Sequence, residues 1–126
     1  MVYVDTNILI YLLEKHERYS DLAVKALEEF SEHNSGLLTS VITITEFLAG
    51  TRTSTPATLH LVPQLQFAMV NESIAEQAAL LQRSQRLQIG DAIHLATAIK
   101  QKADLFFTND KQLAKAVAKF IKVRSL

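Results

Sequence analysis

Four acidic residues from separate parts of the chain are placed to act together. Asp5 follows a short β-prone apolar run, and Asp110 follows another within three residues. Glu46 lies in a helical stretch after a second such run, and Asp91 begins the helical stretch before the run that precedes Asp110. In open α/β sheets, ligands bind in the crevice beyond the carboxyl ends of the strands. The four carboxylates are therefore expected to converge at one end of a sheet.

The chemistry expected of such a cluster is metal-assisted hydrolysis. Unpaired carboxylates in one crevice repel one another and cannot all stay ionised without a counter-charge. A divalent cation supplies that charge, and an all-oxygen ligand set suits Mg²⁺ or Mn²⁺ rather than zinc. One or two such ions can lower the pKa of a bound water and hold a phosphodiester for in-line attack.

Each acid alone also has an ordinary structural explanation. Asp5, Asp91 and Asp110 could cap helices or stabilise turns, and Glu46 could be a solvated residue on a helix edge. His94, expected on the same helix as Asp91, is predicted to be a packed or solvated helix-face residue near that acid. The joint placement of the acids, more than any one of them, favours a functional site.

The elements that would position these acids alternate between strands and helices. Apolar, β-prone runs predict strands at 2–4, 36–39, 67–70, 104–108 and 120–123. Periodicity and capping residues predict helices at 8–13, 20–32, 40–50, 73–87, from 91 onward, and 111–119. Residues 51–66 hold both prolines and are expected to form a loop with a short helix. Gly90 is expected to interrupt the helical structure and so separate two helices. The alternation predicts one α/β domain spanning 1–126, with a central, mostly parallel five-stranded sheet flanked by helices.

The composition excludes several other classes of site. With no cysteine, the chain has no disulfide, thiolate nucleophile or Cys-ligated metal. With only three glycines, it has neither a Walker A loop nor a G-x-G-x-x-G fingerprint, and it lacks the G-x-S-x-G elbow of many serine hydrolases. The N-terminal residues lack the basic segment of a signal peptide, and no apolar run is long enough to span a membrane. A cytoplasmic protein is expected.

The charge of the chain is balanced overall but not evenly distributed. The 13 basic and 13 acidic residues cancel, and setting the four candidate acids aside leaves 9 acidic residues against 13 basic ones. Residues 100–126 carry seven basic and two acidic side chains. Neutrality is therefore compatible with an acidic site beside a basic flank that binds nucleic acid. The candidates for phosphate contacts are Lys111, Lys115, Arg83 and Arg86.

Four segments resemble the motifs of one known family. They are Val-Asp-Thr-Asn-Ile-Leu-Ile at 4–10, Thr-Glu-Phe-Leu-Ala-Gly at 45–50, Gly-Asp-Ala-Ile-His-Leu-Ala-Thr-Ala at 90–98 and Thr-Asn-Asp at 108–110. In this order, and in a chain this short, they resemble a PIN domain and, more narrowly, the VapC-type ribonuclease toxins of prokaryotic toxin–antitoxin pairs. The resemblance extends over the whole chain.

The resemblance implies a role for each matching residue. It assigns the metal to Asp5, Glu46, Asp91 and, as the more variable fourth acid, Asp110. Thr6 and Thr108 resemble the hydroxyl residues that orient the acids or a metal-bound water. Proteins of this kind are Mg²⁺- or Mn²⁺-dependent endoribonucleases acting on tRNA, rRNA or mRNA, commonly homodimers, and a cognate antitoxin inhibits them by threading a C-terminal segment over the active-site groove.

Two alternatives and one departure accompany this reading. A PIN-like scaffold that binds RNA or protein without catalysis would require an incomplete set of acids. A phosphatase of the haloacid-dehalogenase type would require D-x-D-x-T, and residues 5–9 lack its second acid and its threonine. Residues 52–66 are shorter and more polar than the corresponding segment of the family, which leaves the RNA recognised and the dimer geometry open.

Overall fold

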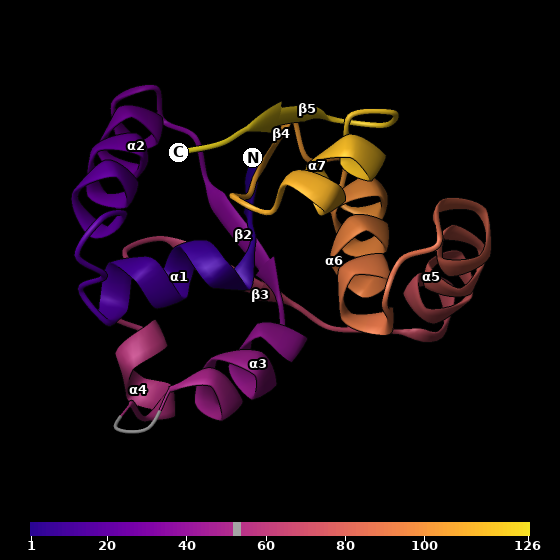
Figure 1. The fold of residues 1–126 in the computed structure, drawn as a ribbon, viewed down its shortest axis with the longest axis horizontal. Coiled ribbons are helices and arrows are strands. Elements are labelled where there is room, and N and C mark those ends of the chain that lie inside the picture. The colour runs from indigo at the N-terminus through magenta and orange to yellow at the C-terminus, as the bar shows by residue number, and fades with distance from the viewer. Residues whose placement is uncertain (52–53) are drawn as a thin grey trace.

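In the computed structural model, which describes residues 1–51 and 54–126, five strands form one parallel sheet (Figure 1). The strands are β1 (Val2–Val4), β2 (Leu37–Ser40), β3 (Leu65–Ala68), β4 (Leu105–Phe107) and β5 (Lys122–Arg124). Their order is β3-β2-β1-β4-β5, so β1 is the central strand. The residue that follows β1 therefore lies at the middle of the carboxyl edge.

Seven helices in the described part of the chain cover both faces of this sheet (Figure 1). They are α1 (Thr6–Leu13), α2 (Ser20–Glu32), α3 (Ile42–Gly50), α4 (Pro56–Leu59), α5 (Glu72–Gln85), α6 (Ile89–Lys100) and α7 (Lys111–Val117). Buried residues of α1 to α4 share one apolar core, and those of α5 to α7 share the other. The two groups of helices meet at the carboxyl edge of the sheet.

The central strand contributes to both cores because successive side chains of a strand point to opposite faces. Tyr3 belongs to the core beneath α5 and α6, whereas Val2 and Val4 belong to the core beneath α1 and α2. All three residues are buried. A strand that is buried on both faces has a continuous run of apolar residues in its sequence, and Val-Tyr-Val is such a run.

The α/β class and the five-stranded sheet are confirmed, with two refinements. The sheet is entirely parallel, and several element boundaries differ from the prediction, three of them for reasons that are visible in the structure. β3 ends at Ala68, where its pairing with Ser40 of β2 stops. β5 starts at Lys122 because the backbone amides of Phe120 and Ile121 both donate to the carbonyl of Val117, in a turn that ends α7.

The third difference concerns Gly90, which was expected to interrupt the helical structure between two helices. That expectation is wrong, because α6 begins at Ile89 and includes Gly90 in its first turn. The amide of Ala92 already donates to the carbonyl of Gln88, the N-cap residue. The expected short helix within 51–66 is α4, and positions 52 and 53 of that segment lie outside the described residues.

A search for membrane-crossing helices in the two described ranges, 1–51 and 54–126, found none of sufficient length and apolar character.

Candidate functional site

Asp5 lies at the centre of the site, directly after β1. Its backbone occupies the N-cap position of α1, but its side chain makes no capping hydrogen bond. Instead, Asp5 Oδ2 accepts a 2.7 Å hydrogen bond from the hydroxyl of Thr108, which follows β4. Asp5 is only 5% exposed and Thr108 is fully buried. Because the buried carboxylate of Asp5 does not cap α1, helix capping does not explain why an acid occupies this position.

Asp110, in contrast, does cap its helix. Its Oδ1 accepts hydrogen bonds from the amides of Gln112 at 2.9 Å and Leu113 at 3.1 Å, at the start of α7. Both amides donate to the same oxygen, so capping is compatible with ligand binding through Oδ2. The structural explanation considered for Asp110 is therefore correct without excluding a functional one.

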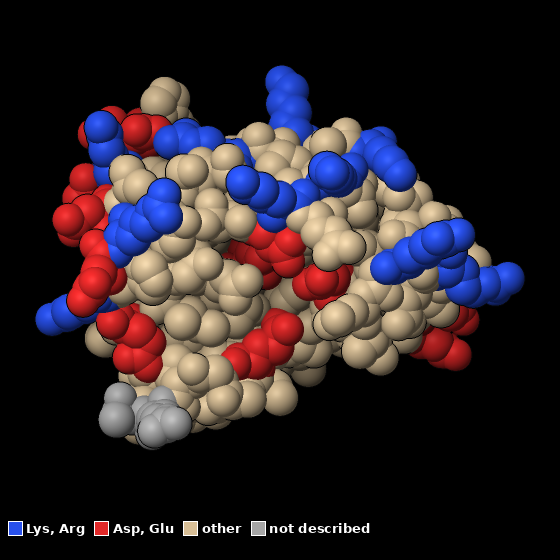
Figure 2. All heavy atoms as spheres, in the orientation of Figure 1, with Lys and Arg blue, Asp and Glu red and all other residues tan. Residues whose placement is uncertain are grey.

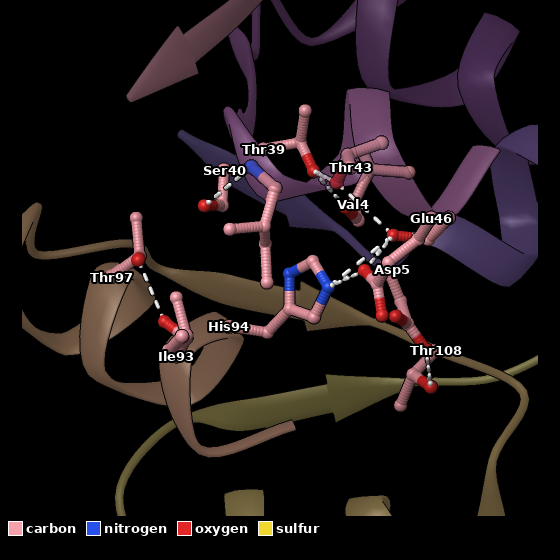
Figure 3. A network of polar contacts seen from close by, with 12 residues as sticks. Val4, Asp5, Thr39, Ser40, Thr43, Glu46, Ile93, His94, Thr97 and Thr108 are labelled. Carbon is pink, nitrogen blue, oxygen red and sulfur yellow. Dashed lines mark hydrogen bonds and ion pairs between the residues drawn. The ribbon is translucent and has the colours of Figure 1, made fainter. Parts of the chain in front are cut away.

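Glu46 is held by hydrogen bonds from two other helices (Figure 3). The hydroxyl of Thr6 on α1 donates to Glu46 Oε1 at 2.8 Å, and His94 Nε2 on α6 lies 2.5 Å from the same oxygen. The other ring nitrogen of His94, Nδ1, lies 2.6 Å from the hydroxyl of Tyr3 on β1. The expectation that His94 is packed near Asp91 did not include this contact with Glu46.

His94 and Tyr3 are thus the residues near the acids that sequence reasoning missed. One signal was available, because residues three apart in a helix share a face, so Asp91 and His94 both point toward the same region. No comparable signal identified Tyr3, whose hydroxyl meets His94 across 91 residues of sequence.

Gly90 allows the first turn of α6 to approach Glu46 closely. A Cβ atom built at Gly90 would lie 3.1 Å from Glu46 Oε2. That distance is shorter than an ordinary van der Waals contact, so any larger residue would displace the carboxylate or the helix. The glycine is explained by this approach and not by helix breaking.

The acids influence one another electrostatically. Burial, followed by the charges of Asp5 and Asp110, raises the pKa of Asp91 to about 6 from 3.8. Burial also raises the pKa of Asp5, and the charge of His94 and the hydrogen bond from Thr108 oppose this effect only in part. Burial acts in the same direction on Glu46. The hydrogen bond and charge of His94, together with the hydrogen bond from Thr6, outweigh it, so the pKa of Glu46 lies below its ordinary value.

These shifts indicate that all four predicted acids share one site. Figure 2 shows acidic side chains around a hollow in the middle of the molecule, where α1, α3, α6 and α7 meet in Figure 1. Within the described ranges, no three His, Asp or Glu side chains already surround a common point as a formed metal cage. The donor set nevertheless fits a hard divalent cation, because it consists of carboxylate oxygens whose mutual repulsion a cation would relieve.

The four basic residues predicted to contact phosphate are all exposed. Lys111 and Lys115 lie on α7, directly after Asp110, while Arg83 lies in the last turn of α5 and Arg86 ends that helix in a left-handed conformation with φ of 54°. Figure 2 shows Lys and Arg side chains above and to the right of the acidic hollow. Basic side chains therefore lie on the same face of the molecule as the acidic hollow.

A cavity of about 410 Å³ lies away from the acids, between α1, α2 and residues 61–64. Its walls are largely leucine and other apolar side chains, including Leu12, Leu27 and Leu61. It contains none of the acids of the hollow, and apolar walls cannot activate water. The acidic hollow is therefore the better candidate for a catalytic site.

Comparison with solved structures finds the same fold over nearly the whole chain. A toxin–antitoxin complex from Klebsiella pneumoniae has a chain with 26% identity and a TM-score of 0.76, covering 98% of this chain and 96% of that one. VapBC2 from Rickettsia felis, bound to a DNA fragment from its promoter, has 20% identity and a TM-score of 0.77, covering 99% and 98%. VapC20 from Mycobacterium tuberculosis, a toxin that cleaves the sarcin–ricin loop, has 20% identity and a TM-score of 0.72, covering 98% and 99%.

Comparison with protein families gives a match that includes every candidate acid. A search of curated protein sequences found no significant relative. The profile of the PIN domain matches residues 2–119, which extend from β1 through α7. This chain therefore belongs to the PIN domain family.

Proposed function

We propose that this protein is a metal-dependent endoribonuclease that hydrolyses RNA phosphodiesters and acts as the toxin of a toxin–antitoxin pair. The observation that carries the proposal is the cluster of Asp5, Glu46, Asp91 and Asp110, in which burial and mutual repulsion raise the pKa of Asp91 to about 6. Membership of the PIN family and the likeness to VapC-type toxins support the same activity.

In this proposal Asp5, Asp91 and Asp110 hold Mg²⁺ or Mn²⁺, together with Glu46. When bound, the ion lowers the pKa of a coordinated water and offsets the negative charge of the phosphodiester. Hydrolysis would leave a 5′-phosphate and a 3′-hydroxyl.

The chain's own hydroxyl groups keep the acids in place. The hydroxyl of Thr108 holds Asp5 through a 2.7 Å bond, and the hydroxyl of Thr6 holds Glu46 through a 2.8 Å bond. Both threonines are buried, so neither hydroxyl is free to turn toward bulk water. Their role is to fix the carboxylates before RNA arrives, which avoids the cost of reorganising them during the reaction.

The basic residues would bind the RNA backbone beside the acids. Lys111 and Lys115 follow Asp110 as exposed side chains of α7, so they can neutralise phosphates that flank the bond being cut. Arg83 and Arg86 would extend this contact from the end of α5. Because these groups meet phosphates and not bases, they would supply affinity without choosing a sequence.

The proposed partners follow from the solved relatives. The Klebsiella pneumoniae structure is a toxin–antitoxin complex, and we extend this to a cognate antitoxin for the present chain. We also propose a homodimer, and a cytoplasmic location where RNA and antitoxin are both present. Since β5 completes the sheet beyond the end of the PIN match, we propose that residues 1–126 form a single domain.

The direct test is cleavage of folded tRNA and rRNA in Mg²⁺, followed by addition of EDTA. We expect cleavage that EDTA abolishes and that Asp5→Asn eliminates. Asp21→Asn, which changes an exposed acid on α2, is the matched control and should cleave normally. Cleavage that survives EDTA, or that persists in Asp5→Asn, would contradict the proposed mechanism.

A further inference from the structure

We infer that His94 and Tyr3 are positioning residues for Glu46, joined to it by a chain of hydrogen bonds through the imidazole of His94. Its consequence for metal binding rests on the proposed function, in which Glu46 helps to hold the ion. The hydrogen-bond chain itself can be tested without metal or RNA.

The three residues come from three elements that meet only in the folded protein. Tyr3 lies on β1, His94 on α6 and Glu46 on α3. The Tyr3 hydroxyl is 2.6 Å from His94 Nδ1. His94 Nε2 is 2.5 Å from Glu46 Oε1 (Figure 3). Tyr3 is fully buried and His94 is 1% exposed, so water does not compete for the contact between them, whereas Glu46 is 39% exposed and its contact with His94 is partly buried.

The chemistry of the partners assigns the protons. An ionised carboxylate can only accept, so His94 Nε2 must carry the hydrogen that points to Glu46. A phenol keeps its proton at neutral pH and can donate to the bare Nδ1. The Nε2 hydrogen of the ring is then directed at Glu46.

This chain determines the direction in which Glu46 presents its second oxygen. His94 and Thr6 both bond to Oε1, whereas Oε2 faces Gly90 in the first turn of α6. The same turn carries Asp91. A threonine hydroxyl rotates, but an imidazole held at both nitrogens does not, so His94 fixes the carboxylate where the proposed ion would bind.

A different explanation is that Tyr3 and His94 only satisfy each other's hydrogen-bonding groups within the core. Removing the phenol hydroxyl would then lower stability without changing the affinity of a site formed by other residues. Metal affinity separates the two explanations, because a purely structural pair has no reason to alter the affinity of the acid site.

The first experiment observes the imidazole nitrogens directly by long-range ¹H–¹⁵N NMR of protein labelled with ¹⁵N-histidine, with His94→Gln used for assignment. We expect a protonated Nε2 in the unmodified protein, as the donor to Glu46. Tyr3→Phe should shift the resonance of Nδ1, which loses its hydrogen-bond partner. A bare Nε2 in the unmodified protein, or an unchanged spectrum in Tyr3→Phe, would overturn the inference.

The second experiment measures Mn²⁺ affinity by calorimetry on variants first shown to be folded by circular dichroism. Loss of an outer hydrogen-bond partner typically weakens metal binding about 10- to 100-fold, so we expect about tenfold for Tyr3→Phe and more for His94→Leu. His94→Gln keeps an N–H donor and should recover part of the loss. Tyr11→Phe removes a phenol hydroxyl on α1 and is the matched control.

The outcomes distinguish this inference from the proposed function. Equal Mn²⁺ affinity in Tyr3→Phe and Tyr11→Phe would overturn the positioning role. Absence of Mn²⁺ binding by the unmodified protein would overturn that role together with the metal-dependent mechanism. Intact Mn²⁺ binding that falls in Tyr3→Phe, in a protein that cuts no RNA, would support the positioning role and contradict only the proposed substrate.

Discussion

Replacing Asp91 with asparagine tests whether the four acids form a cluster that repels itself. The pKa of Asp91 is raised from 3.8 to about 6, so the folded protein binds this proton more tightly than the unfolded chain does. Stability therefore falls as pH rises from about 4 to about 6, and the whole penalty is present above that range. Asp91→Asn removes the penalty and should stabilise the metal-free protein at pH 8, but not at pH 4.

The size of the effect follows from the pKa and from the surroundings of Asp91. Without screening, a change from 3.8 to about 6 corresponds to ~3 kcal/mol. Asp91 is only partly buried, so solvent reduces this value. Asparagine also gives up a favourable interaction with the N-terminus of α6, which is worth about 0.5 kcal/mol. We expect a net stabilisation of about 1 kcal/mol, or about 4 °C in Tm.

The assay is thermal unfolding followed by circular dichroism between pH 4 and pH 8 in EDTA. Glu76→Gln, which changes an exposed acid on α5, should show no comparable dependence on pH. Adding Mg²⁺ at about 100 times its Kd should stabilise the unmodified protein by about 2.7 kcal/mol and reverse the order of the two proteins. If Asp91→Asn is no more stable at pH 8 in EDTA, or differs equally at every pH, burial and the neighbouring acids do not destabilise the charged form of Asp91.

Three further substitutions test other parts of the site. Gly90→Ala should lower RNA cleavage on the order of tenfold while thermal unfolding changes little, because the added Cβ displaces Glu46 by a fraction of an ångström as alanine improves the helix. Thr108→Val should cost about 1–3 kcal/mol in urea unfolding, because the buried carboxylate after β1 loses its hydroxyl donor. Lys111→Glu combined with Lys115→Glu should weaken RNA binding and lower the slope of log K against log salt by about 1 to 2.

Each of these has its own control. Gly36→Ala, where a Cβ meets only a flexible methionine side chain at 3.5 Å, should leave cleavage unchanged. Thr108→Ser keeps the hydroxyl and should retain most of the stability lost in Thr108→Val. Lys15→Glu with Lys25→Glu, outside the basic flank, should not alter the salt slope. A tenfold loss of cleavage in Gly36→Ala would contradict the argument about Gly90. Equal losses of stability in Thr108→Val and Thr108→Ser would contradict the role of the Thr108 hydroxyl. An unchanged salt slope in the double variant of Lys111 and Lys115 would contradict their contact with phosphate.

The sheet and most helices could be predicted because their signals are local. Parallel strands buried on both faces are continuous apolar runs, and Val-Tyr-Val and Leu-Phe-Phe are such runs. The end of β3 could not be predicted, because it is set by its register with β2 at Ser40, which is a property of the folded sheet. The prediction for Gly90 was wrong for the same reason, because the glycine allows a close approach to Glu46, which lies 44 positions earlier in the chain.

The acids could be predicted because each has a recognisable place relative to a strand. The sequence alone could not show which acids cap helices, because Asp5 and Asp110 both occupy positions typical of helix caps. The structure separates them, since Asp110 caps with its side chain and Asp5 does not. His94 and Tyr3 escaped detection because a buried histidine that only packs and one that holds an acid have the same sequence pattern.

The central place of β1 has a consequence for the order in which the site can form. Asp5 is synthesised 103 residues before Thr108, whose hydroxyl holds it. The strand that precedes Thr108, β4, spans Leu105–Phe107 and pairs with β1. A nascent chain that stops before β4 has Asp5 without this donor and lacks Asp110 altogether. For a nuclease that could damage the ribosome-bound RNA around it, activity would begin only after β4 and Asp110 have been synthesised.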